Sequence, residues 1–162
     1  MSAPSVVIAQ ALPHELAVIR QFMLAYAAER NLDLSFQGFQ AELDTLPGAY
    51  APPEGALFLA RLDGAPAGSV AVRRSGAGIA ELKRLYLQST ARGAGVGRRL
   101  AVTAIEWAAA SGYRTMRLDT VPGMEVAQAL YRSLGFVEIE AYRHNPIPGV
   151  KFFERNLRPD SA

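Results

Sequence analysis

Apolar residues recur along the first third of the chain at the three- and four-residue spacing of a helix. One such run predicts a helix that starts at Pro13 and has its apolar face formed by Leu16, Ile19, Phe22 and Tyr26. A second helix, capped by Ser35, is predicted to bury Phe36, Phe39, Leu43 and Leu46. A β-branched run over Val6–Gln10 predicts a first strand, and the segment 47–53, rich in proline, predicts a loop.

Three runs rich in strand-forming residues come next. They cover Ala56–Leu62, residues 67–73 and Ile79–Leu87. Short turn signals separate them, first Asp63-Gly64 and then the segment 75–78. Because turns this short join antiparallel neighbours, we expect these three strands to form an antiparallel unit.

The second half of the chain alternates between helix and strand. A glycine-rich loop at 92–97 opens a helix that runs to about residue 111 and is predicted to bury Val96, Leu100, Thr103, Trp107 and Ala110. A strand over 115–119, a helix over 126–134 and a closing hairpin of 136–142 and 151–157 complete the order β-α-α-β-β-β-α-β-α-β-β. No repeat or linker divides the chain, so we expect one domain over residues 1–162.

Composition narrows the class of protein. Half of the 162 residues are apolar and 20% are charged, which is the balance of a packed globular domain. The absence of cysteine excludes a disulfide framework, thiolate zinc sites and a cysteine nucleophile, and we expect no metal. A net charge of +2 does not point to nucleic acid. Without an apolar run of about 20 residues or a charged leader, we expect a cytoplasmic protein that does not bind a membrane.

The loop at 92–97 is the clearest candidate binding site. Its glycines let the backbone approach a ligand closely and turn successive N–H groups toward one point. The helix that follows contributes the positive end of its dipole, and Arg92, Arg98 and Arg99 add charge. This combination predicts a cradle for a phosphate or pyrophosphate. The alternative is a glycine-rich turn that only ends a strand.

Two other nucleotide-binding motifs can be tested on the same residues. A P-loop requires a Gly-Lys-Ser/Thr sequence, which the chain lacks. A dinucleotide fingerprint requires a third glycine or alanine at a position that holds Arg98 or Leu100. Four residues also separate the preceding strand from the loop, so the dinucleotide interpretation fails.

The pattern Arg92-x-x-Gly95-x-Gly97 resembles the Gln/Arg-x-x-Gly-x-Gly/Ala signature of the GNAT superfamily of N-acetyltransferases. Two further segments fit in order: ELKRLYL at 81–87 resembles the fourth strand of that family, and ALYRSLGF at 129–136 resembles its helix end. The resemblance covers about residues 6–157. It implies an α/β (α+β) domain with a mixed, mostly antiparallel sheet, splayed fourth and fifth strands, and flanking helices.

The resemblance also implies acetyl-coenzyme A as cosubstrate. Its pantetheine arm would pair with the backbone in the gap between the splayed strands, and the loop amides would hold the pyrophosphate. The implied coenzyme-binding residues are Leu85, Tyr86, Leu87, Arg92, Gly93, Ala94, Gly95, Val96, Gly97 and Arg98. Many members carry an asparagine where this chain has Met124, so Met124 is left out of the predicted site.

Acetyl transfer to an amine calls for a base and an acid. An aliphatic amine with a pKa of roughly 10.4 is almost fully protonated near neutral pH, and attack requires the neutral form. The resemblance implies that Glu81, eleven residues before Arg92, is the base. The alternative is a strand-end carboxylate paired with Lys83 or Arg114. Tyr131 is implied as the acid that faces the coenzyme sulfur, and simple packing of its ring is the alternative.

The sequence leaves the acceptor open. In the family, the first two helices and the last hairpin wall the acceptor cleft, which gives candidates by location only: Phe36, Tyr142, Arg143, His144 and Asn145. A small-molecule or amino-acid-like amine is predicted first, a protein lysine or N-terminus second, and a coenzyme-binding sensor without catalysis third. A homodimer is left open. Asp119 is interpreted as a turn or helix cap, and His14 as the start of a helix.

Overall fold

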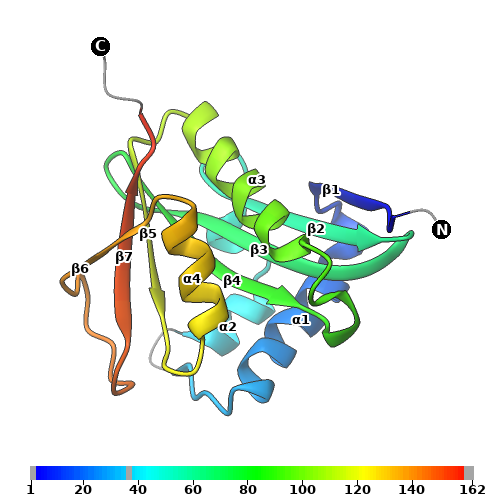
Figure 1. The fold of residues 1–162 in the computed structure, drawn as a ribbon, viewed down its shortest axis with the longest axis horizontal. Helices are drawn as coiled ribbons and strands as arrows, with labels where there is room; N and C mark the ends of the chain where they lie inside the picture. Colours follow the sequence, from blue (N-terminus) through cyan, green and yellow to red (C-terminus); the bar gives the residue numbers. More distant parts are fainter. Residues whose placement is uncertain (1–2, 36–37, 159–162) are drawn as a thin grey trace.

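Strands from both halves of the chain form one sheet. The computed structural model describes residues 3–35 and 38–158, and within them seven strands lie in the order β1-β2-β3-β4-β5-β7-β6 (Figure 1). Every pair is antiparallel except β4 with β5. The strands are β1 (Val6–Gln10), β2 (Ala56–Leu62), β3 (Ala65–Gly76), β4 (Ile79–Leu87), β5 (Thr115–Thr120), β6 (Val137–Ile139) and β7 (Lys151–Asn156).

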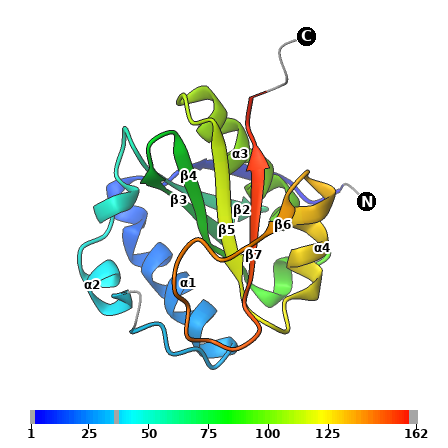
Figure 2. The ribbon, with the colours of Figure 1, turned by 90° about the vertical axis from the view of Figure 1, so that its left-hand side faces the viewer.

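Helices cover both faces of the sheet. They are α1 (Leu16–Glu29), α2 (Phe39–Asp44), α3 (Val96–Ala110) and α4 (Glu125–Ser133). Figure 2 shows α1 and α2 on one face and α3 and α4 on the other. Each face has its own apolar core: Ile19, Phe22 and Met23 of α1 pack on one side, and Leu100, Ala104 and Ala108 of α3 on the other. The expected fold class is confirmed.

The predicted bounds of two elements were wrong. The second helix begins at Phe39 rather than after Ser35, because Gly38 adopts a left-handed conformation (φ 68°) immediately before it. Phe36 lies outside the described residues. The predicted strand 136–142 shrinks to β6, because only its residues 137–139 pair with β7. Tyr142 and Arg143 therefore belong to the loop between β6 and β7.

The buried face of α3 also differs from its predicted stripe. Ala104, Ile105 and Ala108 are buried, whereas Ala110 is exposed and Thr103 is only partly buried. Small alanine side chains let the helix approach the sheet. Trp107 packs at the margin instead, with its ring 6.5 Å from that of Phe58 and 6.2 Å from that of Tyr113.

A bulge in β4 decides which way the site residues point. Between the pairs Ser69–Tyr86 and Ala71–Lys83, β4 advances three residues while β3 advances two, and Arg84 has a positive φ of 59°. An extra residue of this kind re-aims the side chains that flank it. Lys83 and Arg84 consequently project toward α1 and α2, whereas Leu85 and Leu87 pack on the α3 side.

Strands β4 and β5 separate soon after they meet. Their parallel pairing covers only Ile79–Thr115, Ala80–Met116 and Glu81–Arg117. Beyond Glu81 the two strands share no further paired residues within the described chain. The expected splay of the fourth and fifth strands is thus present, and it opens toward the glycine-rich loop.

Candidate active site

A cleft of about 580 Å³ lies between the end of β4, the start of α3 and the start of α4. It collects most of the residues predicted to hold the coenzyme: Leu85, Leu87, Arg92, Gly93, Gly95, Val96, Gly97 and Arg98. Ala94 and Tyr86 do not line it. Tyr86 faces α1, where its ring lies 5.4 Å from that of Phe22 and its hydroxyl donates to Glu29.

The loop before α3 leaves its backbone open to a ligand. Gly93 and Gly95 have φ values of 86° and 77°, and a Cβ atom at either position would have no atom within 4 Å. No side chain caps α3, and its first turn contains no acidic residue. Because the first N–H groups of a helix have no partner within it, these amides suit an anion.

Three arginines line the cleft, and sequence reasoning missed one of them. Arg92 pairs with Glu29 at 2.9 Å, and Arg98 donates to the Ser133 hydroxyl at 3.1 Å. The third is Arg30, just after α1, whose guanidinium stacks 4.7 Å from the Tyr26 ring. Arg30 is a single basic residue after a helix and belongs to no motif, so nothing in the sequence marks it as a binding residue.

Met124 also belongs to the site, although the sequence analysis left it out. Its sulfur accepts a hydrogen bond from Arg30 Nε at 2.7 Å. Together with Leu85, Met124 lines both the large cleft and a smaller cavity of about 30 Å³ at its inner end. The two cavities therefore adjoin at these two side chains.

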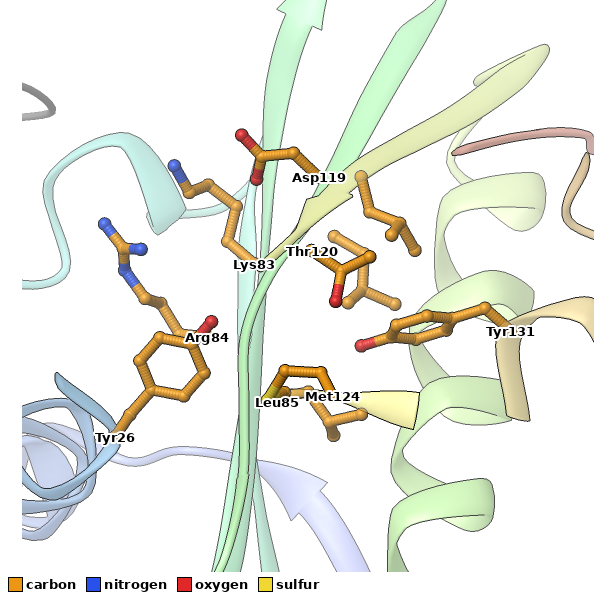
Figure 3. A pocket seen from close by; sticks show the side chains of 10 residues that line it. Tyr26, Lys83, Arg84, Leu85, Asp119, Thr120, Met124 and Tyr131 are labelled. Carbon is orange, nitrogen blue, oxygen red and sulfur yellow. The ribbon is translucent and has the colours of Figure 1, made fainter. Parts of the chain in front are cut away.

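The small cavity holds the predicted acid. Figure 3 shows Tyr131 reaching into it from α4, beside Thr120 and opposite Lys83 and Arg84. The Tyr131 ring is buried and packs edge-on against Phe136 at 5.8 Å. Burial raises the pKa of the Tyr131 hydroxyl above its ordinary value. The buried hydroxyl of Thr120 has no hydrogen-bond partner within the described residues, which leaves a polar atom for a ligand.

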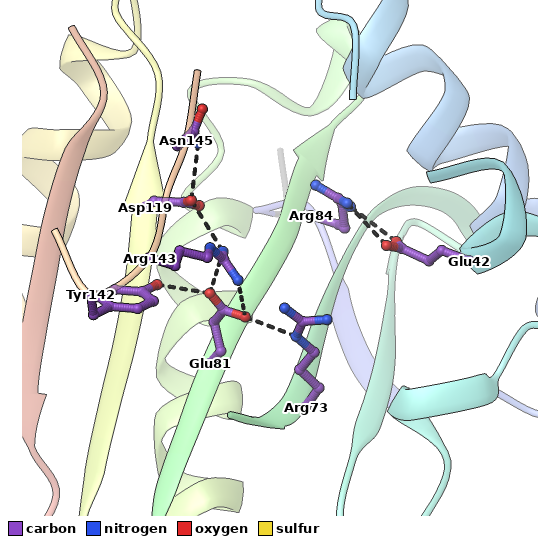
Figure 4. Close-up of polar contacts among 8 residues, drawn as sticks. All are labelled: Glu42, Arg73, Glu81, Arg84, Asp119, Tyr142, Arg143 and Asn145. Atoms are coloured by element: carbon purple, nitrogen blue, oxygen red, sulfur yellow. Dashed lines mark hydrogen bonds and ion pairs between the residues drawn. The ribbon is translucent and has the colours of Figure 1, made fainter. Parts of the chain in front are cut away.

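Glu81, the predicted base, lies inside an ion-pair network on the α1 face (Figure 4). Its carboxylate is fully buried, pairs with Arg73 at 2.8 Å and with Arg143, and accepts a hydrogen bond from the Tyr142 hydroxyl at 2.7 Å. Lys83, one of the two partners expected from the sequence, acts on the Glu81 carboxylate through its charge.

The network determines the charge state of Glu81. Burial would raise the pKa of its carboxyl group, but Lys83, Arg143 and Arg73 and the Tyr142 hydrogen bond outweigh burial and lower it. A carboxylate held in this way accepts a proton less readily than an ordinary glutamate. The base role of Glu81 stays a prediction.

Asp119 and the loop between β6 and β7 extend the network. Arg143 bridges Glu81 and Asp119, reaching the Asp119 carboxylate at 3.1 Å, and Asn145 donates to the same oxygen at 3.2 Å. Asp119 also lines the small cavity, so it is part of the site rather than only a turn residue. His14 and His144 are exposed and line neither cavity.

Two features are absent from the described part of the chain. No group of three or more His, Cys, Asp or Glu side chains in residues 3–35 and 38–158 is arranged to hold a metal ion. Over the same residues, no helix combines the length and apolar character needed to span a membrane.

Comparison with known proteins agrees with this geometry. The model of the acetyltransferase (GNAT) family matches residues 20–136. An uncharacterized N-acetyltransferase of Schizosaccharomyces pombe is 37% identical over 148 residues, covering 90% of this chain and 91% of the relative. The chain therefore belongs to the GNAT family, and its activity class is N-acetyl transfer from an acyl-coenzyme A.

Solved structures share the fold. A GNAT acetyltransferase of Staphylococcus aureus superimposes with a TM-score of 0.80 at 19% identity, covering 95% of this chain and all of the other. The PaiA N-acetyltransferase of Thermoplasma acidophilum, solved in complex with coenzyme A, superimposes with a TM-score of 0.73 at 16% identity, covering 94% and 99% of the two chains.

Proposed function

We propose that this chain transfers the acetyl group of acetyl-coenzyme A to the amine of a small molecule. The observation that carries the proposal is that the cleft at the open loop before α3 and the small cavity beside Tyr131 share Leu85 and Met124 in their linings, where β4 and β5 separate. A pyrophosphate in the cleft and a thioester at the small cavity would suit this arrangement. The coenzyme in the solved relative from T. acidophilum supports the same assignment.

The residues present fit the coenzyme. The uncapped amides of Gly95 to Arg98 and the side chain of Arg92 would hold the pyrophosphate. Around Leu85 and Leu87, the edge of β4 that faces β5 has no paired strand, and it would take the pantetheine arm as if the arm were that strand. The coenzyme would supply the activated acetyl group. The residues of the chain would orient that group and transfer protons to or from the reacting atoms.

Tyr131 is proposed as the acid that protonates the departing thiolate. Tyr131 lines the inner cavity, and its hydroxyl keeps its proton at neutral pH because burial raises its pKa. Tyr131→Phe keeps the packed ring and deletes only the hydroxyl. We expect kcat to fall at least roughly tenfold while the affinity for acetyl-coenzyme A barely changes, the pattern of an interaction made mainly in the transition state.

A matched variant separates chemistry from folding in this measurement. Tyr113→Phe deletes another largely buried hydroxyl, which donates to the Glu54 carbonyl at 2.6 Å away from the cleft. Losing the Tyr113 hydrogen bond costs about 1 kcal/mol, and Tyr131→Phe keeps the packed ring, so both variants should stay folded at room temperature. Near-normal kcat in a stable Tyr131→Phe protein would return Tyr131 to a packing role.

The proposed function as a whole is tested by free-thiol release from acetyl-coenzyme A across a panel of amines, amino acids and peptides. We expect release with at least one class of small amine, and we expect peptides to be poorer because the inner cavity is narrow, at about 30 Å³. A preference for peptides would favour a protein acceptor. Coenzyme binding in calorimetry without any release would leave a sensor rather than an enzyme.

A further inference from the structure

The charged side chains on the α1 face of the site have an excess of positive charge. We define the acceptor-side cluster as Arg73, Lys83, Arg84, Arg143, Glu42, Glu81 and Asp119. These are four cations and three carboxylates. Lys83, Arg84 and Asp119 line the small cavity beside Tyr131 directly, and Arg143 joins them through Asp119. The excess charge therefore lies where the acceptor must approach the acetyl group.

Arginines of the cluster already engage each of its carboxylates. Arg84 holds Glu42 through two hydrogen bonds of 3.0 Å, and its guanidinium stacks 5.1 Å from the Phe39 ring. Arg143 shares Glu81 with Arg73 and Asp119 with Asn145 (Figure 4). An acceptor ammonium would thus meet carboxylates that are already neutralised, and it would add a further positive charge to the cavity.

Two observations show that the cluster favours an anion. The Nε atom of Arg143 is buried and has no hydrogen-bond partner within the described residues, although an arginine N–H that is removed from water needs an acceptor. Burial, together with the charges of Arg84, Arg73 and Arg143 and against that of Glu81, lowers the pKa of Lys83 to about 7, which means that this part of the cluster disfavours added positive charge. With Lys83 in its ionised form, the cluster carries one positive charge more than its three carboxylates balance.

We infer that the acceptor amine carries a carboxylate, which Arg143 and Lys83 hold while the amine faces the acetyl group in the small cavity. The substrate class is then that of amino acids and other amino-carboxylates rather than simple amines. A carboxylate balances the excess charge and matches the donors of a guanidinium. This inference rests on the proposed acetyl transfer for its reaction, but the binding of a carboxylate can be tested separately.

The test compares acceptors that differ only in the carboxylate: an amino acid, its carboxamide and its decarboxylated amine, across a set of side chains. The rate of free-thiol release from acetyl-coenzyme A gives kcat/KM for each. We expect the best carboxylate acceptor to exceed its two counterparts at least roughly tenfold. Equal or faster turnover of the amide and the decarboxylated amine would overturn the inference.

Variants of the cluster test whether its cations cause the preference for a carboxylate acceptor. Arg143→Gln and Lys83→Met each remove one cation, and both should reduce the preference to within about threefold, mainly by slowing the carboxylate acceptor. Arg117→Gln is the matched control, because Arg117 also pairs with a carboxylate, Glu154 at 2.8 Å, and stacks 5.3 Å from the Tyr142 ring without lining the cavity. It should keep the full preference. Equal loss in Arg117→Gln would mean a general structural effect and would overturn the assignment.

Lys83→Met keeps the test valid if Arg143→Gln fails to fold. Burial disfavours the Lys83 ammonium, so a methionine of similar length should be tolerated at this position. A preference that is unchanged in a folded Lys83→Met protein would remove Lys83 from the binding site.

A second measurement separates this inference from the proposed function. If no amine in the panel releases thiol, the proposed function fails, and N-acetylated amino acids and their amides are then titrated by calorimetry into the protein loaded with coenzyme A. Binding of the carboxylate forms alone, lost in Arg143→Gln, would keep the inference. Equal binding of both forms, or binding of neither, would overturn it.

Discussion

Replacing Gly95 by glutamate is expected to weaken acetyl-coenzyme A binding by at least about 100-fold. Gly95 precedes α3, and open space surrounds the position that its Cβ would take, so the new carboxylate would project into the cleft. It would place a negative charge at the amides that are proposed to hold the pyrophosphate. Calorimetric titration of the wild type and the variant with acetyl-coenzyme A measures the loss.

The main confounding effect in this variant is backbone strain. Gly95 has a φ of 77°, and a left-handed conformation costs roughly 1–2 kcal/mol in any residue other than glycine. Gly112→Glu is a matched control, because Gly112 follows the opposite end of α3, has a φ of 96° and is also surrounded by open space. It should cost similar stability and leave binding intact. Tight binding by a folded Gly95→Glu protein would place the coenzyme elsewhere.

Glu81→Gln is expected to lower the free energy of unfolding by about 3 kcal/mol, which is the lower part of the range for breaking a buried ion pair. The Glu81 side chain is 0% exposed, and removing its charge leaves Arg73 and Arg143 without their shared counter-ion. Denaturant titration at pH 7 measures the effect. Glu54→Gln is the control, because the ion pair of Glu54 with Arg74 is more than half exposed on the Glu54 side and should contribute little.

The stability difference between the wild type and Glu81→Gln should depend on pH. Because the pKa of Glu81 is lowered from its ordinary value of 4.5, its ionised form stabilises the fold above that value, and this stability is lost as the pH falls through the folded-state pKa. The stability difference between wild type and Glu81→Gln should therefore shrink below about pH 4.5. A difference that stays constant from pH 7 into this acidic range would mean that the ionisation of Glu81 does not stabilise the fold.

The pH profile of kcat for Glu81→Gln tests the prediction that Glu81 is the base. A base with a lowered pKa requires an inflection below 4.5 in the pH profile of kcat, and the variant must lose that inflection together with rate. If a folded variant keeps the profile of the wild type, Glu81 acts by positioning Arg143 and not by accepting a proton. Deprotonation of the amine by solvent would then be the preferred route.

Local patterns in the sequence determined most of the architecture. The bounds of β1, β2 and β4 follow directly from runs of strand-forming residues, and α1 follows the apolar spacing of Ile19 and Phe22. The loop at 92–97 could also be recognised, because its function depends on adjacent residues: glycine conformations, helix-start amides and neighbouring arginines all lie within one short segment. Features of this kind need no knowledge of distant contacts.

Tertiary structure alone decided the acceptor side of the site. Glu81 meets Arg143, which lies 62 positions later in the chain, and Arg30 meets Met124, which is 94 positions later. Neither spacing has a periodicity that sequence analysis could use, since both contacts depend on how the sheet orders its strands. The bulge at Arg84 similarly turns the side chains of Lys83 and Arg84 to one face of the sheet. The extra residue in β4 interrupts the alternation by which successive side chains of a strand point to opposite faces. The sequence determined the strands and the anion-binding loop, which are local, whereas the packing of distant segments determined which charges surround the acceptor.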